Sequence, residues 1–135
     1  MRFMMMVKGD KSYEAGAAPD PELGAAIGKL SEEMMRTGVM VDMGGLLPSA
    51  MGARVRLAGG KLTVTDGPFS EAKEVIGGYA ILRADSRQEA IELGKRFMAL
   101  HAGVLGSSYE GELEIRQMAE FGPEPTRGCQ PGEMT

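Results

Sequence analysis

The chain has 135 residues, 43% hydrophobic and 25% charged, with 15 basic and 19 acidic side chains and a formal net charge of -4. This composition is typical of one globular domain and excludes a disordered or fibrous chain. The charges are scattered and form no basic face, so we expect neither nucleic-acid nor membrane binding. A single cysteine, Cys129, allows no internal disulfide and suits a cytoplasmic protein, and the motifs predict no cofactor and no metal site.

The first predicted elements are a strand and a helix. An uninterrupted apolar run at residues 3–7 predicts a strand that is covered on both faces. After a loop rich in Gly, Ala and Pro, Asp20 precedes Pro21, which is typical of a helix start because Asp can cap free N–H groups and Pro suits the first helical position. The apolar spacing then predicts a helix over residues 21–37, which Gly38 can end in a left-handed conformation.

A strand and a hairpin follow in the middle of the chain. Residues 39–47 predict a strand that bends or bulges at Gly44-Gly45. Gly59-Gly60 predicts a two-residue hairpin turn, because glycine adopts positive φ at little cost. The flanking residues then pair apolar with apolar and polar with polar: Leu57 with Leu62, Val55 with Val64, Arg56 with Thr63 and Arg54 with Thr65. This register predicts a hairpin with one buried face.

The remaining elements are a buried strand, a helix and a half-buried strand. Residues 78–82 are apolar enough for a second buried strand. Ser86 and Glu89 match a capping box that opens a helix running to about His101. Strict alternation over residues 112–116 predicts a strand with only one face buried.

Without the hairpin, the elements follow the order strand, helix, strand, strand, helix, strand. This is the split βαβ arrangement of an α+β, ferredoxin-like fold, in which the continuously apolar strands 3–7 and 79–82 are central. Two helices cover one face of the sheet, so we expect a homodimer that packs sheet against sheet, with the hairpin helping to clasp the partner. The single domain covers 1–121, and the Pro- and Gly-rich residues 122–135 predict a flexible C-terminal tail.

Three segments resemble the signature of a known family. Residues 63–69 (TVTDGPF), 71–74 (EAKE) and 77–79 (GGY) are similar to the DGPF proteins, a branch of the YCII-related family, and the likeness extends over roughly residues 1–118. It implies a dimeric α+β barrel. Members of the family are often encoded beside sigma factors of the extracytoplasmic-function type, which implies a role in a sigma-factor pathway. Some relatives have a proposed catalytic His-Asp pair with the histidine in the first helix, but residues 21–37 contain no histidine.

Asp66 is the main candidate for chemistry. Its carboxylate follows a strand at a rigid turn, where burial against Phe69 would suit a general base. A tight turn, however, needs Asp, Gly and Pro at these positions whatever the function. Arg54, opposite Thr65, could either pair with Asp66 or bind an anionic ligand beside it. Thr65 and Phe69 complete the part of the predicted ligand site that surrounds Asp66.

Three more residues are candidates with structural alternatives. Lys73 could add an ammonium group to the same cleft or be simply solvated. Tyr79 could donate a hydrogen bond into the cleft or be a satisfied core residue. His101 could interact with the dipole at a helix C-terminus or lie on the surface, or it could be a pH-sensitive or catalytic group.

Three functions remain open on the sequence. The first is a dimeric binding module that holds a small apolar or carboxylated molecule in a cleft near Asp66, between the sheet and the helices. The second is a cofactor-free small-molecule enzyme with Asp66 as its base. The third is an accessory interaction protein of a sigma-factor pathway that binds no small ligand.

Overall fold

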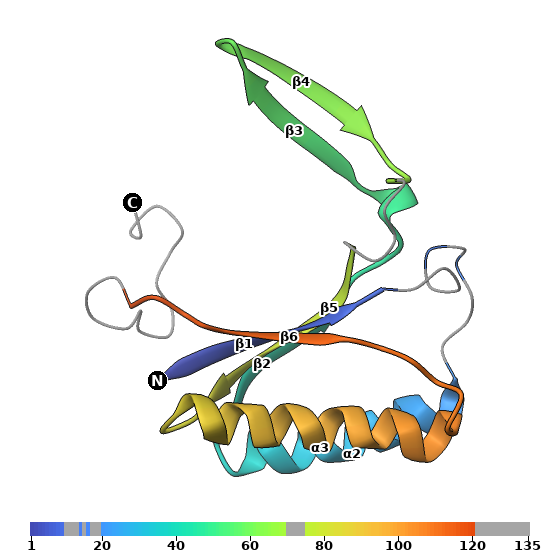
Figure 1. Ribbon diagram of the computed structural model, residues 1–135, viewed down its shortest axis with the longest axis vertical. Helices are drawn as coiled ribbons and strands as arrows, with labels where there is room; N and C mark the ends of the chain where they lie inside the picture. The colour runs from blue at the N-terminus through green and yellow to red at the C-terminus, as the bar shows by residue number, and fades with distance from the viewer. Residues whose placement is uncertain (10–13, 15, 17–19, 70–74, 121–135) are drawn as a thin grey trace.

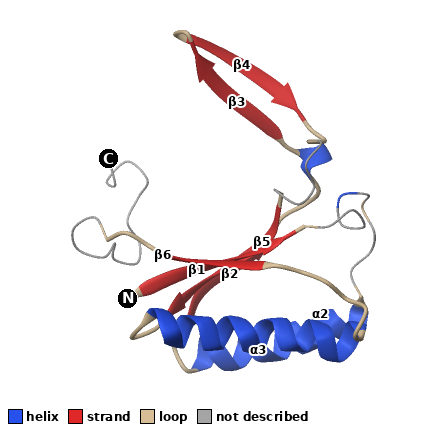
Figure 2. Ribbon diagram, viewed as in Figure 1, coloured by secondary structure: helices blue, strands red, loops and turns tan. Residues whose placement is uncertain are grey.

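The computed structural model describes residues 1–9, 14, 16, 20–69 and 75–120. A four-stranded antiparallel sheet has two helices on one face, and a separate two-stranded hairpin extends from it (Figures 1 and 2). The elements follow in the order β1 (Arg2–Lys8), α2 (Pro21–Arg36), β2 (Met40–Gly45), the short 3-10 helix η1 (Ser49–Met51), β3 (Ala53–Ala58), β4 (Lys61–Asp66), β5 (Ile76–Arg83), α3 (Arg87–Leu105) and β6 (Leu113–Gln117).

Helix α2 begins and ends as the sequence predicts. Oδ1 of Asp20 accepts hydrogen bonds from the backbone N–H groups of Glu22, at 2.9 Å, and Leu23, at 3.0 Å. These bonds satisfy two of the N–H groups that the first helical turn leaves without partners. Gly38 has a φ of 80° just after the helix, which is the left-handed conformation expected there.

Helix α3 starts as predicted and ends later. Oγ of Ser86 accepts from the backbone N–H of Glu89 at 3.1 Å, and the Glu89 carboxylate accepts from the N–H of Asp85 at 3.2 Å, one residue before the cap. The predicted end near His101 is wrong, since the helix continues to Leu105. Leu105 continues the row of Phe97 and His101 at four-residue spacing, and the helix includes Gly103 in its last turn despite the low helix propensity of glycine.

The strand order of the sheet is β2-β5-β1-β6, which confirms β1 and β5 as central strands. Phe3 and Met5 of β1 are 1% and 2% exposed and face the helical layer. Met4 and Met6, which alternate with them, are only half-buried. The prediction that this strand is covered on both faces is therefore wrong for the described part of the single chain, because none of its helices covers the second face, called here the helix-free face (Figure 1). The described chain forms no closed barrel.

The irregularity of β2 lies elsewhere than expected. The register shifts between Met40 and Asp42, whereas Gly44 and Gly45 pair regularly with β5. Gly44 instead makes room for an aromatic ring, because a Cβ at this position would lie 2.8 Å from Cε1 of Tyr79. Gly44 thus serves close packing rather than a bend.

The hairpin has the predicted register, with Val55 opposite Val64 and Leu57 opposite Leu62. Its predicted buried face is wrong for the single chain, because these four side chains are 67% to 69% exposed. Figure 1 shows β3 and β4 projecting from the sheet on the side away from α2 and α3. A two-stranded ribbon on its own offers no second layer to cover its apolar face.

Candidate functional site

A cavity of about 580 Å³ opens between the helices and one end of the sheet. Both helices contribute side chains at four-residue intervals, which lie on one face of a helix. The lining includes Leu23, Ile27 and Ser31 from α2, Phe97, His101 and Leu105 from α3, and Met5, Val7, Met40, Met43, Tyr79 and Ala80 from the sheet, with several glycines. Tyr109 and the charged residues Lys8 and Asp20 also border it. The lining is thus mainly apolar and is drawn from segments far apart in the sequence. We call it the sheet-helix cavity.

Two glycines create the hollow at the end of the sheet. Gly45 pairs with Gly78, and the Gly78 position also pairs with Val7, so all three belong to the cavity side of the sheet. A Cβ added at Gly45 would meet no atom within 4 Å, whereas one at Gly78 would lie 3.2 Å from the carbonyl oxygen of Gly44. The cavity therefore exists partly because this pair carries no side chains.

His101 is the main polar group of the sheet-helix cavity. It is 6% exposed, so the prediction of a surface residue is wrong. Its Nδ1 lies 3.1 Å from the carbonyl oxygen of Phe97, which can only accept, and Nδ1 therefore carries a hydrogen. The ring meets Phe97 edge-on at 4.9 Å and stacks on Tyr109 at 5.5 Å between centroids. No described residue bonds to Nε2, which in the neutral ring is an acceptor.

Ser31 is a second polar group on the cavity wall. It is 6% exposed, and its hydroxyl forms no hydrogen bond with another described residue. Sequence reasoning missed this residue, because a serine in an amphipathic helix normally faces solvent. The available signal was its spacing, since Ser31 follows Leu23 and Ile27 at intervals of four residues and so continues their apolar row.

Tyr79 borders the same cavity, but its side chain belongs to the other face of the sheet. Its neighbour Ala80 is buried in the core beneath the helices, and successive side chains of a strand alternate between faces. Accordingly, the ring of Tyr79 lies across Gly44. The structure thus brings Tyr79 close to His101 in the fold without joining their side chains in one site.

The residues around Asp66 lie at the base of the hairpin, and none of them lines the sheet-helix cavity. Asp66 and Thr65 are exposed. The Arg54 guanidinium lies 3.8 Å from the centroid of the Phe69 ring, a cation-π contact, and it faces Thr65 in the predicted register. Lys73 lies outside the described residues.

The turn that contains Asp66 is fixed to η1 by close packing. A Cβ at Gly67 would lie 1.7 Å from the carbonyl oxygen of Ser49, so only glycine fits there. The backbone N–H of Phe69 donates to Oγ of Ser49 at 3.0 Å. The backbone and hydroxyl groups of Ser49 both donate to the Glu14 carboxylate, and these hydrogen bonds, the hydroxyl first, lower the pKa of Glu14. Gly67 and Phe69 of the motif thus have clear structural roles.

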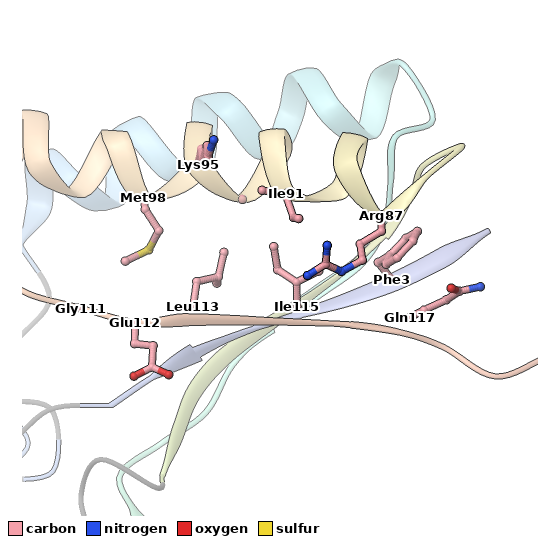
Figure 3. A pocket seen from close by; sticks show the side chains of 11 residues that line it. Phe3, Arg87, Ile91, Lys95, Met98, Gly111, Glu112, Leu113, Ile115 and Gln117 are labelled. Atoms are coloured by element: carbon pink, nitrogen blue, oxygen red, sulfur yellow. The ribbon is translucent and has the colours of Figure 1, made fainter.

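A second cavity of about 580 Å³ lies between α3 and the edge strand β6 (Figure 3). Gly94 allows the close approach of these elements, since a Cβ there would lie 2.7 Å from Cδ1 of Ile115. Arg87, Lys95 and Glu112 border it and are exposed. This cavity contains none of the candidates from the sequence and no buried polar group, so the sheet-helix cavity is the better candidate site.

The described residues offer no metal site. They contain no group of three or more His, Cys, Asp or Glu side chains that could hold a metal ion. Within the same residues, no helix is long and apolar enough to cross a membrane.

Comparison with known proteins gives two matches. The sequence model of the YCII-related domain family matches residues 1–109, which include every element except β6. An uncharacterized protein of Rhizobium meliloti (strain 1021) is 24% identical over 94 residues, which is 70% of this chain and 71% of that protein. Its description names no ligand and no reaction.

Proposed function

The chain belongs to the YCII-related domain family, and from this premise we propose that it binds a small, mainly apolar molecule in the sheet-helix cavity, with His101 as the polar contact. The observation that carries the proposal is a buried imidazole in an apolar wall, held through Nδ1 with Nε2 left for a ligand. The volume of about 580 Å³ suits a small molecule. Ligand sites of other proteins likewise combine apolar walls with a few polar groups.

The chemistry of His101 favours a ligand with one hydroxyl or carboxyl group. A neutral ring that donates from Nδ1 accepts at Nε2 from a hydroxyl or a protonated carboxyl, while a protonated ring would pair with a carboxylate. Ser31 adds a hydroxyl on the facing helix. The small apolar or carboxylated ligand expected from the sequence is therefore retained, and the proposed contact moves from Asp66 to His101.

No observation favours the other two functions. An enzyme with Asp66 as base would need this carboxylate beside a substrate, but Asp66 is exposed and does not line the sheet-helix cavity. The link to a sigma-factor pathway and the cytoplasmic location stay predictions from the sequence. A pull-down with a sigma factor of the extracytoplasmic-function type as bait would test the first of them.

We also propose that two copies form a dimeric, ferredoxin-like α+β barrel by packing their helix-free faces together. Met4 pairs with Ile81 and Met6 with Tyr79, so these four side chains form an apolar centre on that face. All four are half-buried in the single chain. Covering them with the same face of a second copy would bury apolar area without a new element.

The ligand proposal can be tested by NMR titration with octanoate and octanol, which share an apolar chain and differ in the polar group. We expect shifts at the residues of the sheet-helix cavity. His101→Phe keeps an aromatic ring and removes both nitrogens, so affinity for the better ligand should fall about tenfold, the effect of a hydrogen bond of about 1.4 kcal/mol. Gly45→Val should fill the floor of the cavity and weaken both ligands.

Gly28→Ala provides the matched control for these variants. Gly28 is exposed on α2, and an added Cβ meets no atom within 4 Å. Binding by this variant should equal that of the wild type. Shifts confined to other surfaces, or affinities unchanged in both His101→Phe and Gly45→Val, would remove the sheet-helix cavity as the site.

A further inference from the structure

The exposed large apolar side chains of the described residues are concentrated in one stretch of the chain. Apart from Met1 and Met35, all of them lie between residues 41 and 64: Val41, Met43, Leu46, Leu47, Met51, Val55, Leu57, Leu62 and Val64. Apolar surface gathered in this way marks an interaction site in soluble proteins, whereas single exposed residues do not. The stretch runs from β2 through η1 to the hairpin.

The hairpin contributes a continuous apolar strip. Directly opposed residues of an antiparallel pair share a face, and residues two apart on a strand share it too. Val55, Val64, Leu57 and Leu62 therefore form one face of the ribbon, which we call the arm face. The opposite face carries two Arg-Thr pairs, Arg54 with Thr65 and Arg56 with Thr63. Such two-sided patterning is typical of a ribbon with one buried and one solvated face.

The single chain does not bury the arm face. Its four side chains are 67% to 69% exposed, while the base of the hairpin is held by hydrogen bonds to η1 and to the residue after it. An isolated two-stranded hairpin is only marginally stable in water. The fixed base and the uncovered face together indicate that the arm face packs against a surface outside the single chain.

A second copy of this chain is the occupant that the structure supports. The hairpin projects on the helix-free side of the sheet, the side that the proposed dimer uses (Figure 1). Leu46 and Leu47, which follow β2, and Met51 in η1 are exposed apolar residues of the segment that joins the sheet to the hairpin. In a twofold dimer each hairpin then meets the other copy, so the surface is complementary to itself.

We propose that the β3-β4 hairpin is an intersubunit arm that packs its arm face onto a second copy of the chain. The hairpin of each copy contacts the other copy. The close packing of Gly67 against Ser49 of η1 fixes the base of the arm. This inference rests on the proposed dimer and goes beyond it, because sheet-to-sheet packing alone does not require the hairpin.

Sedimentation velocity over a concentration series tests the arm. Leu57→Glu combined with Leu62→Glu places two carboxylates on the arm face, whereas Thr63→Glu combined with Thr65→Glu places two on the opposite face of the hairpin, both on β4. We expect the wild type to be a dimer. The dimer dissociation constant should rise at least tenfold in the first double variant and change less than twofold in the second. Far-UV circular dichroism should show unchanged helix content in both.

A third variant separates the two proposals. Ile81→Glu charges the helix-free face and leaves the hairpin intact. Dissociation by Ile81→Glu together with an unaffected Leu57→Glu/Leu62→Glu dimer would overturn the arm and retain the sheet-to-sheet dimer. A monomeric wild type at micromolar concentration would overturn both proposals.

Hydrogen exchange of the wild type gives a measurement that needs no variant. Amides of β3 and β4 should exchange more slowly at concentrations where the dimer dominates than at concentrations where the monomer does. Equal exchange of these amides in monomer and dimer would refute the arm even if the double variant failed to fold.

Discussion

Replacing Gly67 with alanine tests whether the Asp-Gly-Pro-Phe turn is an architectural anchor. The added Cβ would lie 1.7 Å from the carbonyl oxygen and 2.6 Å from the carbonyl carbon of Ser49, whereas ordinary contacts begin at 3.4 Å. Both groups belong to the backbone, so no side chain can rotate away. The turn must move away from η1, and the hydrogen bonds across this contact must lengthen or break.

The expected cost follows from these contacts. Overpacking of this kind costs about 1–3 kcal/mol. Two hydrogen bonds are also at risk, from the Gly67 N–H to the Gly52 carbonyl at 2.9 Å and from the Phe69 N–H to Oγ of Ser49 at 3.0 Å. With about 1 kcal/mol for each bond, the anchor loses at least about 2 kcal/mol. Because the hairpin lies outside the core, we expect local opening at its base rather than unfolding of the whole domain.

Amide hydrogen exchange measures this local opening directly. A loss of 2 kcal/mol corresponds to about a 30-fold fall in the protection of the amides at positions 67 and 69. Gly28→Ala, in an open position on α2, should leave these amides unchanged and raise the unfolding free energy by about 0.5–1 kcal/mol. Protection of both amides within threefold of the wild type in Gly67→Ala would refute the anchor.

Two further predictions concern the helix start and the acid behaviour of the chain. Asp20→Ala removes both capping hydrogen bonds of α2 and should lower the free energy of unfolding by about 1 kcal/mol in urea; an unchanged midpoint would show that the cap is dispensable. Hydrogen bonds from Ser49 lower the pKa of Glu14 from 4.5. The ionised Glu14 therefore contributes fully to the stability of the folded chain above that pH, and this contribution is lost as the pH falls through the folded-state pKa. The difference in melting temperature between wild type and Glu14→Gln should therefore narrow on acidification below 4.5, and a constant difference would contradict this.

Much of the fold follows from local patterns in the sequence. Continuous apolar runs predicted the central strands, and paired glycines at 59–60 predicted the hairpin register, because each pattern depends on residues close together in the chain. The same patterns could not say which molecule covers an apolar face. The hairpin was therefore expected to be buried, although its apolar residues are exposed in the single chain.

The candidate site was less predictable, because it is assembled from distant segments. Asp66 stood out through its turn motif, but it is exposed and does not line the sheet-helix cavity. His101 was a candidate from the sequence, with a surface position or a helix-dipole contact as alternatives, and α3 continues past it and carries it into the apolar row. Ser31 carried no motif at all. Its place beside His101 is recognised only when the two helices are placed over the same end of the sheet.

The Gly45-Gly78 pair gives the cavity a simple means of changing its selectivity. Position 45 has room for a side chain and carries no backbone contact that forbids one. Alanine, valine or leucine there would shorten the available space in steps, with the strand pairing and both helices left in place. In the ligand site that we propose, a change at this one position would therefore alter the size of the molecule that fits, while His101, the proposed polar contact, stays in place.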